Sequence, residues 1–177
     1  MTKDDVIAQL HTILTNFVFG VALRCCFPEE LWQKITIEAL EFEYGAALAK
    51  VELRPLANRM TNPVERQSLF DEYEKSLKRS LLSESHDVIC NYCEETAQFS
   101  VYKAQAWFEF ARIIRNTTSH KDGGILHQWP DKRVKIAKWR TRTLDPSMVG
   151  QAIDFTPYEA LRLAQDQTDF VISNQLQ

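Results

Sequence analysis

Apolar residues recur at the spacing of a helix over most of the chain, and this periodicity limits the fold more than any other feature. Between Lys3 and about Phe27 it predicts a first helix, with an apolar face formed by Val6, Leu10, Ile13, Leu14, Phe17, Val18 and Val21. A second helix is predicted to begin at Pro28-Glu29-Glu30, because proline and acidic residues suit a first helical turn. It is predicted to continue to about Val51 and to end by Pro55, with the apolar residues Leu31, Ile35, Leu40, Phe42 and Leu48.

Two further helices follow from the same rules. Thr61-Asn62-Pro63, with Glu65 next, supplies a cap, a proline and an acid, and predicts a helix to Tyr92 that is either continuous or broken near Ser83. A fourth helix is predicted from about Ala97 to Asn116, with a broad apolar face of Val101, Ala104, Trp107, Phe108, Ala111 and Ile114.

The helical periodicity of apolar residues stops after Asn116. Residues 117–124 combine poor helix formers with a Gly-Gly stop, and Val134 and Ile136 suggest a short strand that pairs with residues 148–155. Thr156-Pro157-Tyr158-Glu159 is a capping box that predicts a last helix to about Asn174. We therefore predict an all-α chain in the main, a single up-and-down helical bundle domain over residues 1–177. A short β-hairpin or irregular excursion precedes its last helix.

Composition and cysteine spacing favour a cytoplasmic protein without a cofactor. No apolar run approaches the ~20 residues of a membrane span, so we expect no membrane contact, and the start MTKDDVIAQL lacks the features of a signal peptide. Cys90 and Cys93 have the spacing of half a zinc site, but Cys25-Cys26 does not supply the other half. We therefore expect reduced, mostly buried thiols and no metal.

The net charge of −3 is an average over two different parts of the chain. Nine basic and two acidic residues give the segment 112–142 a charge of +7, so the other 146 residues carry −10. A local basic segment can bind a polyanion even in an acidic protein, and Trp139 offers a ring for base stacking. The candidate RNA-binding residues are Arg112, Lys121, Lys132, Arg133, Lys135, Lys138, Arg140 and Arg142. The alternative is a solvated edge strand.

Arg115, Asn116 and His120 form a candidate catalytic set. Histidine gives or takes a proton near neutral pH, and arginine grips a phosphate with parallel donors, so the pair suits attack by a ribose 2′-OH on its neighbouring phosphate without a metal. Positions 115 and 120 are roughly 140° apart on an ideal helix. The two side chains converge only if the helix unwinds at Thr117-Thr118-Ser119 or if another chain supplies one of them.

The segment from Arg115-Asn116 to His120, after an apolar helix and before Asp122-Gly123-Gly124, resembles the signature of HEPN domains. That signature is an arginine, a polar residue that is often asparagine, a short spacer and a histidine. HEPN proteins include metal-independent ribonucleases of toxin–antitoxin and antiviral defence systems, and non-catalytic RNA-binding relatives. The active members place two copies of the motif face to face in a homodimer. One subgroup has a tyrosine where this chain has Asp122, so regulation through that tyrosine is not implied.

The resemblance implies that Arg115 and His120 are the catalytic pair, that Asn116 orients the site, and that a homodimer binds RNA, with an antitoxin-like protein as a possible regulator. The alternative is a non-catalytic HEPN module for RNA binding or protein interaction. In the simplest alternative, Asn116 caps a helix and Arg115 is a solvated cation. His127, after the glycines, is either a second site residue or a residue that packs in its loop, and we expect the second.

Overall fold

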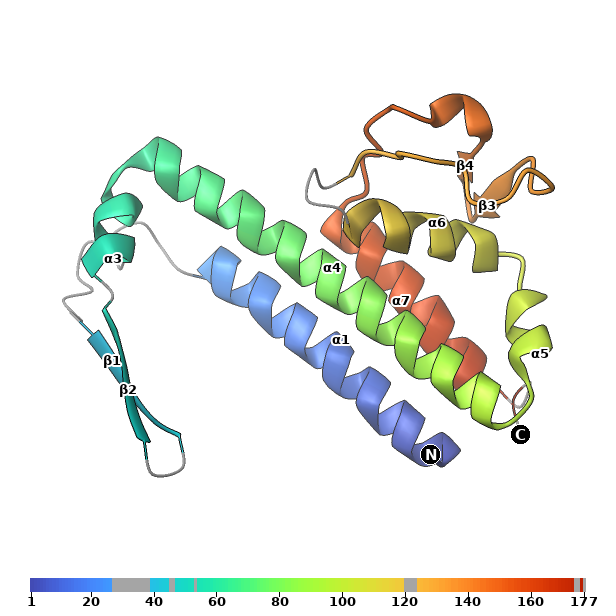
Figure 1. Cartoon of the computed structure of the whole chain (residues 1–177), viewed down its shortest axis with the longest axis horizontal. Coiled ribbons are helices and arrows are strands. Elements are labelled where there is room, and N and C mark those ends of the chain that lie inside the picture. Colours follow the sequence, from blue (N-terminus) through green and yellow to red (C-terminus); the bar gives the residue numbers. More distant parts are fainter. Residues whose placement is uncertain (27–38, 45–46, 53, 120–123, 174–175, 177) are drawn as a thin grey trace. The chain divides into compact units, whose positions relative to one another are not determined.

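The computed structural model describes residues 1–26, 39–44, 47–52, 54–119, 124–173 and 176 (Figure 1). Within these ranges the chain is mostly helical, as predicted, with two short β-hairpins. The helices are α1 (Lys3–Cys26), α3 (Arg54–Thr61), α4 (Pro63–Glu95), α5 (Phe99–Lys103), α6 (Phe108–Ser119) and α7 (Pro157–Ile172). The strands are β1 (Ala39–Tyr44), β2 (Ala47–Glu52), β3 (Ala137–Trp139) and β4 (Arg142–Leu144), and a 3-10 turn, η1, covers Pro146–Met148.

Two compact units make up the chain, one of residues 1–19 and 75–177 and the other of residues 20–74. In the first unit α1 runs antiparallel to α4 and α7 (Figure 1). The ammonium group of Met1 lies 3.0 Å from the Glu95 carboxylate at the end of α4, and Lys3 Nζ donates to the carbonyl of Leu176, beyond α7, at 2.8 Å. The predicted helical bundle, with a short β excursion before its last helix, is therefore present.

The core of the first unit joins helices that are distant in the sequence. One buried cluster combines residues of α1, α4, α5, α6 and α7, namely Val6, Leu10, Ile89, Tyr92, Cys93, Tyr102, Phe108, Phe170 and Val171, with Leu176. A second aromatic group joins Phe110 of α6, Trp139 of β3 and Phe155, whose ring centroids lie 5.6 to 6.0 Å apart. This second group holds the β3–β4 hairpin against α6.

The helices between residues 63 and 119 agree with the prediction except for one observed break, between Lys103 and Phe108. α4 is continuous through Ser83, because the segment after Pro63 contains neither proline nor glycine to interrupt it. The single helix predicted over 97–116 is wrong, since the chain leaves the helix after Lys103 and re-enters at Phe108. This break brings the Tyr102 and Phe108 rings edge to face at 4.9 Å, so both enter the same core.

The second unit contains the largest departure from the sequence prediction. Residues 39–44 and 47–52 pair as antiparallel strands instead of forming a helix, with Leu40 opposite Val51 and Phe42 opposite Ala49. Leu40, Phe42 and Tyr44 alternate with Glu41 and Glu43, and this two-residue period outweighs the weaker helical spacing. The predicted helix start at 28–30 lies outside the described residues.

Local signals placed the last helix correctly but not the strands before it. The Thr156 hydroxyl accepts from the Glu159 N–H, and the Glu159 carboxylate accepts from the Thr156 N–H, which completes the predicted capping box. The predicted pairing of a strand near Val134 with residues 148–155 is wrong. β3 pairs instead with β4 across a two-residue turn in which Arg140 has a φ of +51°, while Ala152 forms an isolated bridge with Ile125.

α1 also corrects the expectation that no segment has the length of a membrane span. It contains no charged residue between Val6 and Leu23, and the best window within Lys3–Cys25 has a mean hydropathy of 1.7, with 22% of it buried. Uncharged polar residues interrupt the apolar run without lowering its mean hydropathy far. By length and composition α1 is the one candidate span in the described part of the chain, and apolar core helices meet the same criteria.

Candidate functional site

The last turn of α6 carries the first part of the predicted catalytic motif and remains helical. The hydroxyl of Thr117 donates to the carbonyl of Ile113 at 2.8 Å, and the Ser119 hydroxyl donates to the carbonyl of Arg115 at 2.7 Å. Thr118 bonds in the same way to the turn before it. Serine and threonine hydroxyls in helices commonly bond in this way to carbonyls of the preceding turn. Unwinding at Thr117-Thr118-Ser119, one of the two ways in which positions 115 and 120 could converge, is therefore absent.

Arg115 contacts two neighbouring side chains, and part of its guanidinium remains exposed. Its Nη2 donates to Oδ1 of Asp87, on α4, at 2.8 Å, and its Nη1 lies 3.5 Å from Oδ1 of Asn116. Its Nε is buried, and no acceptor within the described ranges forms a hydrogen bond with it. The side chain as a whole is 33% exposed and that of Asp87 is 53% exposed, so the ion pair is partly solvated. An anionic oxygen could bind to the exposed part of the guanidinium, whereas the buried Nε is out of reach of a ligand.

The chain that follows the motif returns to α6 and is fixed there by backbone hydrogen bonds. The N–H of Gly124 donates to the Thr117 carbonyl at 3.2 Å, with a φ of +108° that favours glycine. The N–H of Leu126 donates to the Gln151 carbonyl at 3.0 Å, and the Leu126 carbonyl accepts from the N–H of Gly150 at 2.8 Å. The backbone immediately before His127 is therefore held by hydrogen bonds at both the N–H and the carbonyl of Leu126.

The helix end and this returning segment together enclose a cavity of about 340 Å³. Its lining consists of Arg115, Asn116, Thr117, Ser119, Leu126, His127, Gln128 and Pro130. The structure thus brings together two of the predicted catalytic residues, Arg115 and Asn116. The third, His120, and the candidate RNA-binding residue Lys121 lie outside the described residues.

His127 is a site residue that the sequence analysis assigned to packing. Its side chain is exposed and lines the cavity, so the expectation that it packs in the loop is wrong. The reason is the turn at Gly124, which folds the chain back along the last turn of α6. The Gly-Gly pair was the available signal, but the direction of the returning chain depends on the bridge between Ile125 and Ala152.

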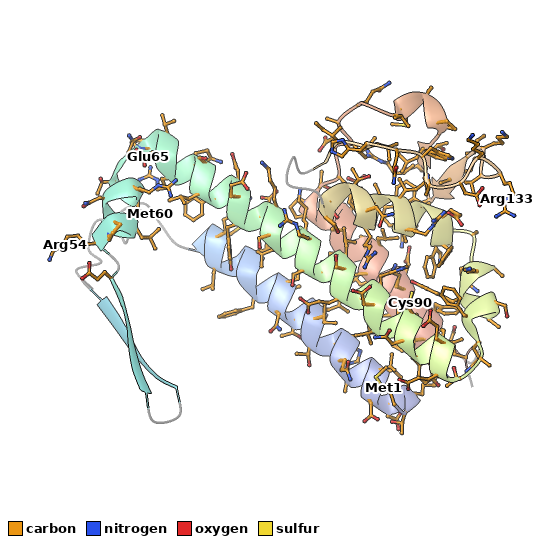
Figure 2. All side chains as sticks on the ribbon, viewed as in Figure 1. Met1, Arg54, Met60, Glu65, Cys90 and Arg133 are labelled. Atoms are coloured by element: carbon orange, nitrogen blue, oxygen red, sulfur yellow. The ribbon has the colours of Figure 1, made fainter. Side chains whose placement is uncertain are left out.

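The arginines of the basic segment have carboxylate partners in the folded chain. Arg112 pairs with Glu109 at 2.6 Å, Arg133 with Asp131 at 3.0 Å, Arg140 with Asp166 at 2.7 Å and Arg142 with Glu159 at 3.3 Å. Glu109, Asp166 and Glu159 belong to helices outside the segment 112–142 or at its edge. In the folded chain, much of the positive charge of the segment 112–142 is therefore paired with carboxylates. Arg133 still projects outward, with its side chain 91% exposed (Figure 2).

The lysines differ from the arginines. Lys132, Lys135 and Lys138 are exposed, and none of them has a hydrogen bond or ion pair to another described residue. Trp139, by contrast, is only 5% exposed and its Nε1 donates to Asp166 at 2.7 Å, so the proposed stacking of a base on this ring is wrong. Among the described residues of the segment, the basic side chains without a carboxylate partner are thus these three lysines, on the chain just beyond the cavity wall at Pro130.

α4 carries a buried histidine, His86, one residue before the Asp87 that pairs with Arg115. Nδ1 of His86 is 2.9 Å from the Tyr102 hydroxyl, and its Nε2 is 3.3 Å from Sγ of Cys90. Burial first, and then the charges of Arg115 and Arg112, lower the pKa of His86 to about 4, while the Asp87 carboxylate opposes them. His86 is therefore neutral at pH 7 and serves the core as a hydrogen-bonded side chain.

The cysteines show no metal chemistry in the part of the chain that the structure describes. Cys25 is exposed, Cys90 (Figure 2) is half-buried and Cys93 is buried, and all three are free thiols. Burial raises the pKa of Cys90 and of Cys93 to about 11, which keeps both protonated and makes them poor ligands. No group of three or more His, Cys, Asp or Glu side chains within the described ranges is arranged to hold a metal ion. The chain matches no protein-family model, no curated protein and no solved structure.

Proposed function

We propose that this protein is a HEPN-type, metal-independent endoribonuclease that acts on RNA in the cytoplasm as a homodimer. The observation that carries the proposal is the cavity at the end of α6, where Arg115 and Asn116 lie together and the Arg115 side chain, 33% exposed, offers its guanidinium to a ligand. A phosphate oxygen is an acceptor of the right charge for that donor. A toxin or defence component, controlled by an antitoxin-like protein, is the role that this chemistry suits.

Each residue of the motif has one task in the reaction. The ribose O2′ forms a bond to the neighbouring phosphorus, the bond from phosphorus to O5′ breaks, and the 2′-OH proton leaves as O5′ gains one. His120 transfers a proton in this exchange, Arg115 stabilises the charge that grows on the phosphate oxygens, and Asn116 orients the phosphate. No step requires a metal.

The homodimer is the arrangement that the resemblance to HEPN domains implies. α6 stays wound through Ser119, so Arg115 and Asn116 keep fixed positions on its last turns. In a homodimer the arginine of one chain and the histidine of the other would meet at one phosphate. A cleft between two copies of the α6 end would hold this phosphate. Lys132, Lys135 and Lys138 would guide the strand toward it.

The test is cleavage of a labelled single-stranded RNA in EDTA by the wild-type protein and by Arg115→Ala and His120→Ala. We expect both variants to lose cleavage by at least about a hundredfold, with unchanged thermal unfolding. Arg162→Ala and His11→Ala are matched controls, because Arg162 bonds only to Gln165 on its own helix and His11 is exposed on α1. Retained cleavage in both motif variants would refute the proposal, and salt-sensitive binding without cleavage would identify the non-catalytic alternative.

A further inference from the structure

We infer that the cavity at the end of α6 receives a single unpaired nucleotide of the RNA, with its phosphate at Arg115 and its base against His127 and Gln128. This inference rests on the proposed function and adds the form of RNA that the site accepts. It assigns a binding role to two residues that follow the motif and that the resemblance does not include.

The size of the cavity points to more than a phosphate. Its volume of about 340 Å³ lies at the lower end of the range for sites that enclose small organic molecules, which is about 300 to 1,000 Å³. A phosphate bound to the exposed part of the Arg115 guanidinium fills a small part of this space. The phosphate's own sugar and base are the groups that RNA would bring into the rest.

The two segments that line the cavity differ in chemistry. α6 contributes the polar residues Arg115, Asn116 and Ser119, suited to phosphate and ribose oxygens. The returning segment contributes the imidazole of His127 and the amide of Gln128, with the apolar Leu126 and Pro130. Histidine rings stack on unpaired bases, and amides both donate to and accept from base edges.

The wall that faces the base is held in place before any ligand binds. Leu126 is buried, and both its N–H and its carbonyl are hydrogen-bonded to the segment 150–151. On the other side of His127, the Trp129 indole donates to the carbonyl of Val134 at 2.6 Å. Because the chain is fixed on both flanks, little conformational entropy is lost when a base stacks there.

An unpaired strand follows as the preferred form of RNA. A base inside a duplex is stacked and paired, so it cannot enter a cavity of this size without breaking those interactions. A base in a single strand or a loop is free to turn out. The cavity should therefore discriminate between the two forms, whereas exposed lysines bind the phosphates of either.

The test measures binding of a fluorescent 2′-O-methyl RNA, which cannot be cleaved through its 2′ position, as a single strand and as the same sequence in a duplex. We expect the single strand to bind more tightly and His127→Ala and Gln128→Ala each to weaken it by at least about fivefold, with little effect on the duplex. His127→Phe keeps a ring for stacking and should restore most of the affinity. His11→Ala is the matched control, and both His127 and Gln128 are exposed, so the fold should tolerate their replacement.

The outcomes separate this inference from the proposed function. Single-strand binding that is lost in Arg115→Ala but unchanged in His127→Ala and Gln128→Ala would overturn the inference and leave the proposed function intact. Equal affinity of the wild-type protein for strand and duplex would also overturn the inference alone. No binding to either RNA would overturn the proposed function and the inference with it.

Discussion

Acidification should destabilise the fold through His86, because this histidine is buried as a neutral side chain. It is 8% exposed, hydrogen-bonded through both ring nitrogens to Tyr102 and Cys90, and packed beside the Phe108 ring at a centroid distance of 6.2 Å. Its pKa is about 4 in the folded chain, whereas a histidine in the unfolded chain titrates near its ordinary value of 6.5. Protonation in the folded chain would place a charge in the core.

The sign of the effect follows from the two pKa values. Between about pH 6.5 and pH 4 the unfolded chain binds a proton that the folded chain does not, so the free energy of unfolding falls as the pH is lowered through this window. Above pH 6.5 His86 is neutral in both states and the free energy of unfolding is at its full value. Below about pH 4 the whole loss that His86 causes has occurred. A difference of about 2.5 pKa units corresponds to about 3 kcal/mol, a large part of the stability of an ordinary domain.

Urea unfolding at a series of pH values between about 7 and 4 measures this contribution. The matched variant is His86→Gln, whose amide can bond to Tyr102 and Cys90 but does not titrate. Other groups affect both proteins equally, so we expect the wild-type protein to lose about 3 kcal/mol more than His86→Gln across the window. Equal pH dependence in the two proteins, or NMR titration of His86 near 6.5 in the folded state, would refute the reasoning.

Three further predictions concern the charges around the cavity and the hairpin. Asp87→Asn removes the negative charge that pairs with Arg115, so we expect RNA affinity to rise by up to about fivefold, as measured by fluorescence anisotropy. We also expect the pKa of His86 to fall, as measured by NMR, and a weaker RNA affinity would contradict the role of Arg115. Burial alone would raise the pKa of Asp166, but its hydrogen bonds from Arg140 and Trp139 outweigh burial and lower it. Asp166→Ala should therefore destabilise the fold by about 2 kcal/mol in urea unfolding, because it leaves the buried Trp139 N–H without a partner, and an unchanged midpoint would count against this. Replacing Lys132, Lys135 and Lys138 together by glutamine should reduce the salt dependence of single-strand binding by about 2 in the slope of log K against log salt, whereas an unchanged slope would remove the three lysines from the RNA path.

Signals within a few residues of one another were interpreted correctly. The capping box at Thr156 and Glu159 needs only those two side chains and the backbone between them, and it begins α7 as predicted. Asn62 likewise accepts hydrogen bonds from the N–H groups of Val64 and Glu65 at the start of α4. Such caps form in the same way whatever the rest of the chain does, so the sequence is enough to locate them.

The predictions that were wrong depended on partners far along the chain. Residues 39–52 carry both a helical and a two-residue spacing, and the cross-strand pairs of β1 and β2 decide between them. The break between α5 and α6 follows from the packing of Tyr102 against Phe108, and the register of β3 and β4 from a turn at Arg140. The local propensities of these residues do not decide between helix and strand, the position of the break or the register of the strands.

The candidate site divides in the same way. The sequence by itself determined that Arg115 and Asn116 lie near the end of an apolar helix and that basic residues gather between 112 and 142. Only the tertiary structure decided that His127 lines the cavity of Arg115, that Trp139 is buried, and that Arg140 and Arg142 pair with carboxylates of α7. The physical reason is range, because helix periodicity and caps act over a few residues, whereas a cavity and an ion pair require the folded chain to bring distant residues together.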